Sequence, residues 1–262
     1  MNPTLTLSTR FGFKPGPGGS HQARSMMLSE LATLFESVPE QGALEDYRTA
    51  VIDENSLSKK TQNNRNISFR HLRNLYSLDP DVALFRVLRR LWDLEPQARP
   101  LLAFQCAYAH DPLLRASATV ILSKHAGEPA TREEIEGFLK KQFEDKLRRT
   151  SIRSFAQNLN GSWTQAGFLK GKVNKIRVHP WAGVGNTAFA LFTAFLAGYR
   201  GEALLRNEWT ALLDIAGEEI LSLAEAASQR GLMRLLRIGS VMEFRFSGYL
   251  TEEEEMLIHG QD

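Results

Sequence analysis

Residues 131–178, TREEIEGFLKKQFEDKLRRTSIRSFAQNLNGSWTQAGFLKGKVNKIRV, are the stretch of this chain that says most about its fold. Thr131 and Glu134 have the spacing of a capping box, which predicts a helix from there to about residue 143. A second helix begins near residue 150, because apolar side chains then recur at three- and four-residue steps. Gly167 suits the left-handed conformation that ends many helices. Residues 168–178 predict two short strands, and this order of helices and ribbon is typical of a winged helix-turn-helix unit.

The C-terminal part of the chain repeats this order of elements. Residues 218–230 predict a helix that ends at Gly231. Residues 232–238 and 241–246 alternate around Gly239 as the strands of a hairpin do. Each of the two units is equally compatible with a winged module and with a helix that merely happens to precede a hairpin.

Upstream of these units the sequence predicts a bundle of helices. Helical periodicity begins near Met26. An acidic residue followed by proline favours a helix start, because the missing N–H of proline would have been unpaired there. Three such pairs each precede an apolar-periodic segment: Asp79-Pro80, Glu95-Pro96 and Asp111-Pro112. Ahead of the bundle, residues 1–25 contain prolines and glycines that break regular structure, so a flexible arm is expected.

The expected fold class is therefore mainly α, a helical bundle with winged helix-turn-helix-like elements and short β-hairpins. Four parts are predicted along the chain. They are a flexible N-terminal arm at 1–25, a helical N-terminal domain with a helix-turn-helix-like element at 26–127, a winged-helix-like segment at 128–182, and a C-terminal helical segment with a β-hairpin at 183–262.

The composition indicates a cytoplasmic protein without a membrane partner. The chain has 262 residues, a formal net charge of +2 and one cysteine, Cys106, which excludes an intramolecular disulfide and suits a reducing compartment. Apolar residues flank Cys106 and predict that it lies in a helix core. The most apolar stretch, residues 188–197, is shorter than the ~20 residues that span a bilayer. The N-terminal residues do not show an apolar run ahead of a cleavage site, so a secretory signal is not predicted.

Basic residues are concentrated in residues 140–179. This stretch contains ten Lys and Arg but only two acidic residues, Glu144 and Asp145. A local positive excess over a helix and a ribbon attracts polyanions, of which nucleic acid is the commonest. Strand alternation places Lys175 and Arg177 on one face of the ribbon, with Ile176 on the other. The side chains of Lys175 and Arg177 are therefore both expected to contact DNA.

A second basic element follows a short turn and covers the predicted helix from 61 to 76. Its polar side chains near the N-terminus and its basic ones beyond them resemble a recognition helix. For both elements the alternative is a solvated basic face without a ligand. The residues expected to contact double-stranded DNA, mainly through phosphates, are Lys59, Lys60, Asn64, Arg65, Arg70, Arg73, Arg149, Arg153, Lys170, Lys172, Lys175 and Arg177.

No pattern in the sequence predicts catalysis, a cofactor or a metal site. The six histidines are scattered without paired ligand spacing, and neither a P-loop nor a G-x-S-x-G motif occurs. Residues 183–188 fit the loose dinucleotide pattern G-x-G-x-x-A. However, Pro180 and Trp181 interrupt the tight strand-to-helix turn that a dinucleotide site requires. The glycines therefore predict a joint before a buried helix.

Several segments resemble the BrxA family, small accessory components of bacterial BREX anti-phage defence systems. The resemblance extends over residues 45–246. It is carried by Val51-Ile52-Asp53-Glu54-Asn55-Ser56-Leu57 through Thr61, the following basic helix with Arg70 and Leu72, Leu113-Leu114-Arg115, and the helix from Asn158 with its Ala-Gly-Phe-Leu ending at Leu169. The resemblance implies a mostly helical protein with winged-helix character, likeness to the antitermination factor NusB, and DNA binding without catalysis. The long glycine-proline N-terminal arm and the Asp-Pro-capped helices depart from the family pattern.

Two further functions remain open from the sequence. Aromatic-rich helices and the acidic run Glu252 to Glu255 are compatible with a helical scaffold that contacts other defence-system proteins and never touches DNA. Likeness to NusB instead implies RNA binding, with a preference for single strands or loops. A homo-oligomer is compatible with each of these functions.

Overall fold

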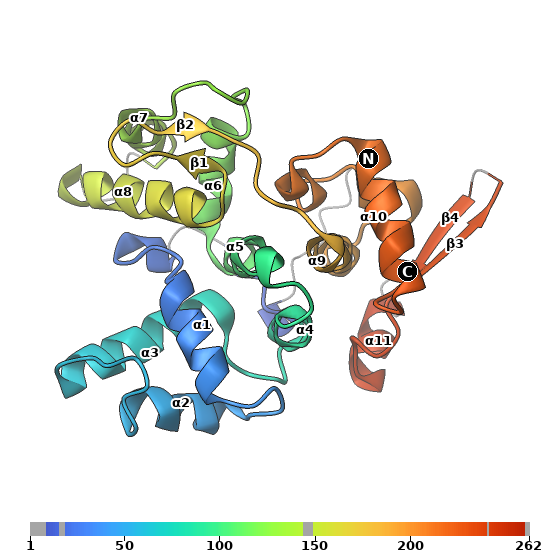
Figure 1. The fold of residues 1–262 in the computed structure, drawn as a ribbon, viewed down its shortest axis with the longest axis horizontal. Helices are drawn as coiled ribbons and strands as arrows, with labels where there is room; N and C mark the ends of the chain where they lie inside the picture. The colour runs from blue at the N-terminus through green and yellow to red at the C-terminus, as the bar shows by residue number, and fades with distance from the viewer. Residues whose placement is uncertain (1–8, 16–18, 144–148, 240, 260–262) are drawn as a thin grey trace.

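The computed structural model describes residues 9–15, 19–143, 149–239 and 241–259, and the chain is mainly helical as predicted (Figure 1). In the N-terminal half the helices are α1 Leu28–Ser37, α2 Leu44–Ile52, α3 Gln62–Tyr76, α4 Ala83–Leu91, α5 Arg99–His110 and α6 Pro112–Ile121. They continue as α7 Arg132–Gln142, α8 Arg149–Gln165, α9 Val184–Leu196, α10 Gly217–Gln229 and α11 Glu252–His259. Short 3-10 helices are η1 Thr9–Phe11, η2 Ser20–Gln22, η3 Pro96–Ala98, η4 Gly201–Leu205 and η5 Thr210–Leu213.

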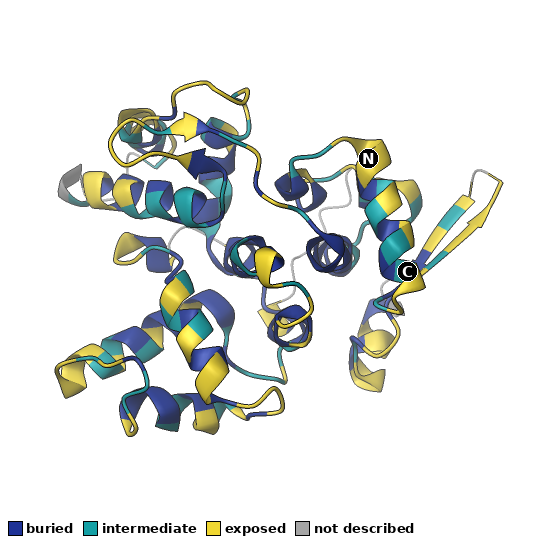
Figure 2. Cartoon of the chain, in the orientation of Figure 1, coloured by how far each residue is buried: buried dark blue, intermediate teal, exposed yellow. Residues whose placement is uncertain are grey.

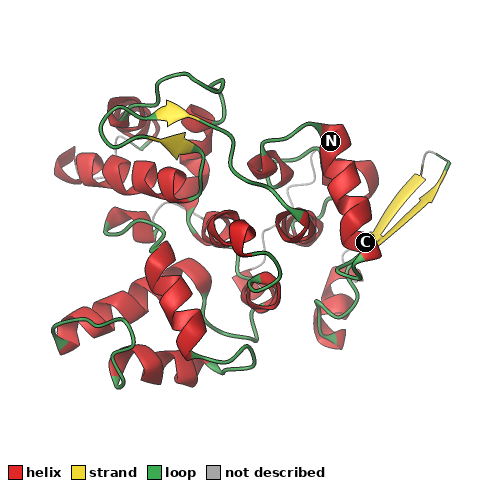
Figure 3. Ribbon diagram, viewed as in Figure 1, coloured by secondary structure: helices red, strands yellow, loops and turns green. Residues whose placement is uncertain are grey.

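Two antiparallel hairpins complete the described part of the fold (Figure 3). The strands β1 Leu169–Lys170 and β2 Ile176–Arg177 form the first, and β3 Arg234–Ile238 and β4 Val241–Arg245 form the second. The predicted turn of the second hairpin is confirmed, since Ile238 pairs with Val241 across it. Figure 1 shows this hairpin projecting from the end of the molecule that carries α10 and α11.

The centre of the molecule is α5, which is buried from Leu101 to His110 (Figure 2). It contacts α3, α4, α6, α8 and α9, so its sequence is apolar on all sides, as expected of a core helix. Cys106 is fully buried within it, as predicted. Buried apolar side chains form one continuous cluster from Phe11 to Ile258, which runs across the predicted boundaries at 127/128 and 182/183.

The prediction of a flexible arm is wrong for residues 9–15 and 19–25. Phe13 is fully buried and meets the Trp209 ring edge-on at 5.2 Å between centroids. His21 is also fully buried. Two phenylalanines and a set of buried polar anchors outweigh the effect of the prolines and glycines, because burying each aromatic ring removes a large apolar area from water. The rest of the predicted arm, 1–8 and 16–18, lies outside the described residues.

The predicted helix starts have mixed outcomes. Asp111 accepts hydrogen bonds from the Leu113 and Leu114 N–H groups at the start of α6, and Thr131 forms the predicted capping box with Glu134. Glu95-Pro96 opens only the 3-10 helix η3. The Asp79 prediction is wrong: its carboxylate accepts from the Asp81 N–H in a turn, and α4 begins at Ala83.

Candidate nucleic-acid interface

The basic stretch of the sequence folds into a compact unit of three helices and a hairpin. Between α6 and α7 the chain runs along the outer edge of β2, where the Arg177 N–H donates to the Glu128 carbonyl at 2.8 Å. The Ala130 N–H donates to the Lys175 carbonyl at 2.9 Å. The order is therefore helix, extended segment, helix, helix, hairpin, with β2 between the extended segment and β1. In Figure 1, α8 lies beside this hairpin.

Three of the predicted contact residues in this unit are exposed. They are Arg153 on α8 and Lys170 and Lys172 on the hairpin. None of them makes an ion pair with a carboxylate of the described residues. Gln157 is exposed one turn beyond Arg153, so the outer side of α8 offers both a cation and an amide. Arg149 begins α8, but its side chain lies outside the described part.

The prediction that Arg177 contacts DNA is wrong. Its side chain is only 2% exposed, and its Nη2 atom lies 2.7 Å from Asp214 Oδ1. The guanidinium also stacks over the Phe168 ring and donates to the Ile121 carbonyl. Arg177 is paired with Leu169 across the hairpin, so both point inward and Ile176 points to solvent. The predicted alternation is thus inverted, because a distant carboxylate and an aromatic ring stabilise the buried guanidinium.

Lys175 is also engaged within the protein. Its Nζ atom donates to Thr164 Oγ1 at 2.6 Å, and burial lowers the pKa of the ammonium group. The hydrogen bond holds the lysine against α8, away from the outer surface of the hairpin. A further hydrogen bond from the ammonium to the Asn160 carbonyl strengthens this attachment, so Lys175 is not counted among the exposed cations.

On the second basic element, α3, the predicted residues also divide into two groups. Lys60, Asn64, Arg70 and Arg73 are exposed. Lys59 instead pairs with Glu30 at 3.1 Å, and Arg65 donates to the Ile52 carbonyl at 3.1 Å. The connection from α2 to α3 spans residues 53–61, longer than the three- to four-residue turn of a helix-turn-helix. The exposed cations are therefore the part of this element that remains available to a ligand.

The N-terminal segment 19–25 joins the two basic elements. It contains η2, which contacts α3 on one side and α8 on the other (Figure 1). Asn158 of α8 donates to the His21 carbonyl at 3.0 Å, and Gln165 donates to Ser25 Oγ at 2.9 Å. Arg24, in this segment, donates to the Ala23 carbonyl at 3.2 Å. Burial, together with the charges of Arg70 and Arg24, lowers the pKa of His71.

Arg24 was therefore missed by reasoning from sequence, because it lies in the segment predicted to be flexible. It is exposed, and its charge acts on His71 of α3 together with that of Arg70, so it adds a cation close to α3. We call the exposed residues Arg24, Lys60, Asn64, Arg70, Arg73, Arg153, Lys170 and Lys172 the basic surface.

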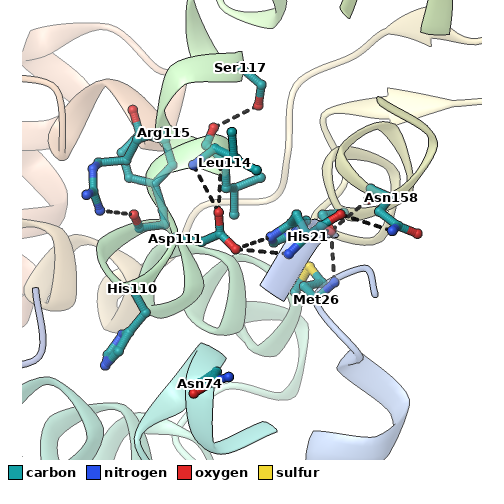
Figure 4. Close-up of polar contacts among 12 residues, drawn as sticks. His21, Met26, Asn74, His110, Asp111, Leu114, Arg115, Ser117 and Asn158 are labelled. Atoms are coloured by element: carbon teal, nitrogen blue, oxygen red, sulfur yellow. Dashed lines mark hydrogen bonds and ion pairs between the residues drawn. The ribbon is translucent and has the colours of Figure 1, made fainter. Parts of the chain in front are cut away.

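Segment 19–25 is held by a buried polar network (Figure 4). His21 Nδ1 lies 2.7 Å from Asp111 Oδ2, and His21 Nε2 lies 2.7 Å from Ser162 Oγ. These are the contacts of a Ser-His-Asp triad. Ser162 and His21 are fully buried, however, and Ser162 Oγ already accepts the Met26 N–H at 2.8 Å. A substrate has no route to this hydroxyl, so the network acts as an anchor.

Asp111 is the centre of that anchor. Its two oxygens accept hydrogen bonds from the His21 ring, the His21 N–H and the N–H groups that begin α6. Burial alone would raise the pKa of this carboxyl, but the charge and hydrogen bonds of His21 hold the pKa below its usual range. The sequence contained no signal for this network, because His21, Asp111 and Ser162 are far apart along the chain.

The adjacent His110 makes the stability of the protein dependent on pH. It is buried, and its Nε2 and Nδ1 atoms lie 2.8 Å from Ser77 Oγ and 2.9 Å from the Cys106 carbonyl. Burial lowers its pKa to about 4. Since the folded pKa lies below the unfolded value of about 6.5, this contribution to stability is complete above pH ~6.5 and is lost as the pH falls through ~4.

We expect the free energy of unfolding to fall by about 3 kcal/mol between pH ~6.5 and ~4 through this group. Urea titrations across that range would measure the loss. The variant His110→Gln keeps a polar side chain without a titrating ring, so its stability should depend less on pH. Identical pH profiles for the two proteins would contradict the assignment to His110.

The glycines at 183–188 do not form an anion site. Asn186 Oδ1 accepts the Gly183 N–H, and Glu95 Oε2 accepts the Gly185 N–H at 3.2 Å. A carboxylate of the protein thus occupies the start of α9, where a dinucleotide would place its pyrophosphate. The helix that follows is buried, as predicted.

Neither a family model nor a curated protein matches this chain. Among the described residues, none of the helices combines the length and apolar character needed to cross a membrane. The same residues contain no group of three or more His, Cys, Asp or Glu arranged to hold a metal ion.

Proposed function

We propose that this protein binds double-stranded DNA without catalysis, mainly through phosphates, by means of the basic surface. The observation that carries the proposal is that segment 19–25 contacts both α3 and α8 and so links two basic elements that are distant in sequence. Arg24, Arg70, Arg73 and Arg153 are exposed there. Arginine is suited to phosphate because its planar guanidinium donates two parallel hydrogen bonds.

The order and pairing of the elements from α6 to β2 favour interpreting this unit as a winged helix. In a winged helix, an extended segment between the first two helices pairs with the hairpin that follows the third helix. The hydrogen bonds from residues 127–130 to β2 have that pattern. In this proposal α8 is the recognition helix, and the loop with Lys172 is the wing that lies along a groove.

The resemblance to the BrxA family supports an accessory role within a BREX-like anti-phage defence system, in the cytoplasm and alongside other defence-system proteins. A phosphate-directed surface fits such a role, because contacts to the backbone position a protein on DNA without choosing a sequence.

Fluorescence anisotropy with a labelled duplex of about 20 base pairs, roughly two helical turns, tests the proposal. If about five cations contact phosphates, log K should fall with log salt at a slope near −4 to −5 between ~50 and ~200 mM salt. A single-stranded RNA and an RNA stem-loop of equal length serve as comparison ligands. Tighter binding to either RNA would favour the NusB-like alternative, and no salt-linked binding to any of the three would contradict nucleic-acid binding.

A scaffold function is the second candidate, and the opposite end of the molecule favours it. Residues 183–262 carry 6 Lys and Arg against 12 Asp and Glu, a net charge of −6, whereas residues 1–182 carry 26 against 18. The acidic end repels nucleic acid. It also carries the β3–β4 hairpin, whose tip residues Ile238 and Val241 are 82% and 67% exposed. Exposed branched side chains beside a turn are suited to a protein contact.

A further inference from the structure

The loop that connects β1 to β2, residues 171–175, is a tight turn that is anchored at both ends. Gly171 has φ of +119°, and a Cβ atom at this position would clash with the Asn174 carbonyl oxygen, so the turn requires glycine. At the other end, the Lys175 ammonium is bonded to Thr164 of α8, and the Lys175 carbonyl accepts the Ala130 N–H at 2.9 Å. We call residues 171–175 the wing loop.

The wing loop presents three consecutive side chains to solvent. They are Lys172, Val173 and Asn174. Val173 is 91% exposed, more than any other large apolar side chain among the described residues. A cation, a short apolar side chain and an amide therefore stand together on one anchored turn, where a ligand can reach all three.

The hairpin that carries the wing loop offers positive charge to a ligand. Residues 169–179 contain no Asp or Glu. Lys170 and Lys172 are exposed, whereas Lys175 and Arg177 are engaged within the protein. In the segment that pairs with β2, the Glu128 carboxylate accepts the His125 N–H at 3.0 Å. The charge that remains available to a polyanion thus lies on the two lysines next to Val173.

The shape and composition of the wing loop fit the minor groove of B-DNA. The minor groove is only ~6 Å wide, so it admits a narrow turn with short side chains but not a helix. Proteins that bind there combine Lys or Asn with an inserted apolar side chain, and a narrow minor groove has a strong negative potential that attracts lysine. The hairpin lies beside α8 (Figure 1), so with α8 in the major groove the wing loop can reach the neighbouring minor groove.

We propose that the wing loop enters the minor groove and gives this protein a preference for A·T-rich duplexes. The inference rests on the proposed function. In the minor groove A·T pairs present only acceptors, to which the Asn174 amide can donate, whereas G·C pairs add the guanine N2 amino group. The methyl groups of Val173 cannot accept a hydrogen bond, so this amino group would be left unpaired against them. Lys172 contacts the phosphates that border the groove.

Anisotropy titrations with three duplexes of equal length test the proposal. One is A·T-rich, one is G·C-rich, and the third is the G·C-rich duplex with inosine in place of guanine. An inosine–cytosine pair lacks the N2 amino group but keeps the major-groove pattern of a G·C pair. We expect the A·T-rich and inosine duplexes to bind about tenfold more tightly than the G·C-rich duplex, a ratio within the range that one unsuitable base pair costs.

Variants of the wing loop identify the source of that preference. Val173→Ala with Asn174→Ala should remove the preference for the A·T-rich and inosine duplexes. Lys172→Ala should weaken binding to all three duplexes alike and make the slope of log K against log salt shallower by about 1. Val241→Ala changes an exposed valine on the other hairpin. It is the matched control and should leave the three affinities unchanged. Thermal unfolding of each variant establishes that it is folded.

The three duplexes separate failure of this inference from failure of the proposed function. Equal affinity for all three would overturn the minor-groove contact and leave DNA binding intact. An inosine duplex that binds as weakly as the G·C-rich duplex would assign the preference to the major groove, which also overturns the inference. A preference that survives Val173→Ala with Asn174→Ala would exclude the wing loop as its source. If no duplex is bound, the proposed function fails and this inference fails with it.

Discussion

Replacing Arg70 and Arg153 together by glutamate is expected to weaken duplex binding at least a hundredfold. The two side chains come from α3 and α8 and are both exposed. A hydrogen bond to a charged group contributes about 1.5–3 kcal/mol, so loss of two such contacts, with repulsion added, corresponds to a change of this order. The slope of log K against log salt should also become shallower by about 2. Anisotropy titrations at several salt concentrations measure both quantities.

The matched control is Arg206→Glu with Arg234→Glu, which changes the net charge equally at the acidic end of the molecule. Both of these arginines are exposed. We expect this control to bind duplex within about threefold of the wild type at moderate salt, because exposed charges farther apart than the Debye length of ~10 Å are largely screened. Equal losses in the two double variants would mean that only net charge matters and that no defined surface exists.

Asp111→Ala is expected to lower the free energy of unfolding by about 3–5 kcal/mol, because it removes a buried carboxylate that several buried donors depend on. The carboxylate is 1% exposed and accepts hydrogen bonds from His21 and from the first turn of α6. Its loss leaves the buried His21 ring and several N–H groups unpaired. Urea unfolding monitored by tryptophan fluorescence measures the change, since Trp163 and Trp209 lie in the core.

Asp79→Ala is the matched control for that experiment. The Asp79 carboxylate accepts one backbone N–H in an exposed turn, so its removal should cost about 0.5 kcal/mol. A similar small loss for Asp111→Ala would show that the network does not anchor segment 19–25. The comparison also tests why one Asp-Pro pair begins a helix and the other does not.

Local signals in the sequence predicted much of the secondary structure. The capping box at Thr131, the glycine that ends α8 and the Gly239 turn all depend on residues within a few positions of each other. Gly167 has φ of +89°, where glycine is favoured. The N-terminal segment could not be predicted in this way, because its order comes from contacts such as Phe13 with Trp209.

The candidate site was likewise predicted from the sequence only in part. The sequence alone determined that basic residues concentrate in α3, α8 and the first hairpin, since charge depends only on residue identity. Only the tertiary structure decided which of them face solvent. Arg177 is neutralised by Asp214 and Lys59 by Glu30, while Arg24 joins the basic surface from a segment that had no predicted structure. Ion pairs and burial depend on which distant residues packing brings within a few ångströms, and one-dimensional spacing does not contain that information.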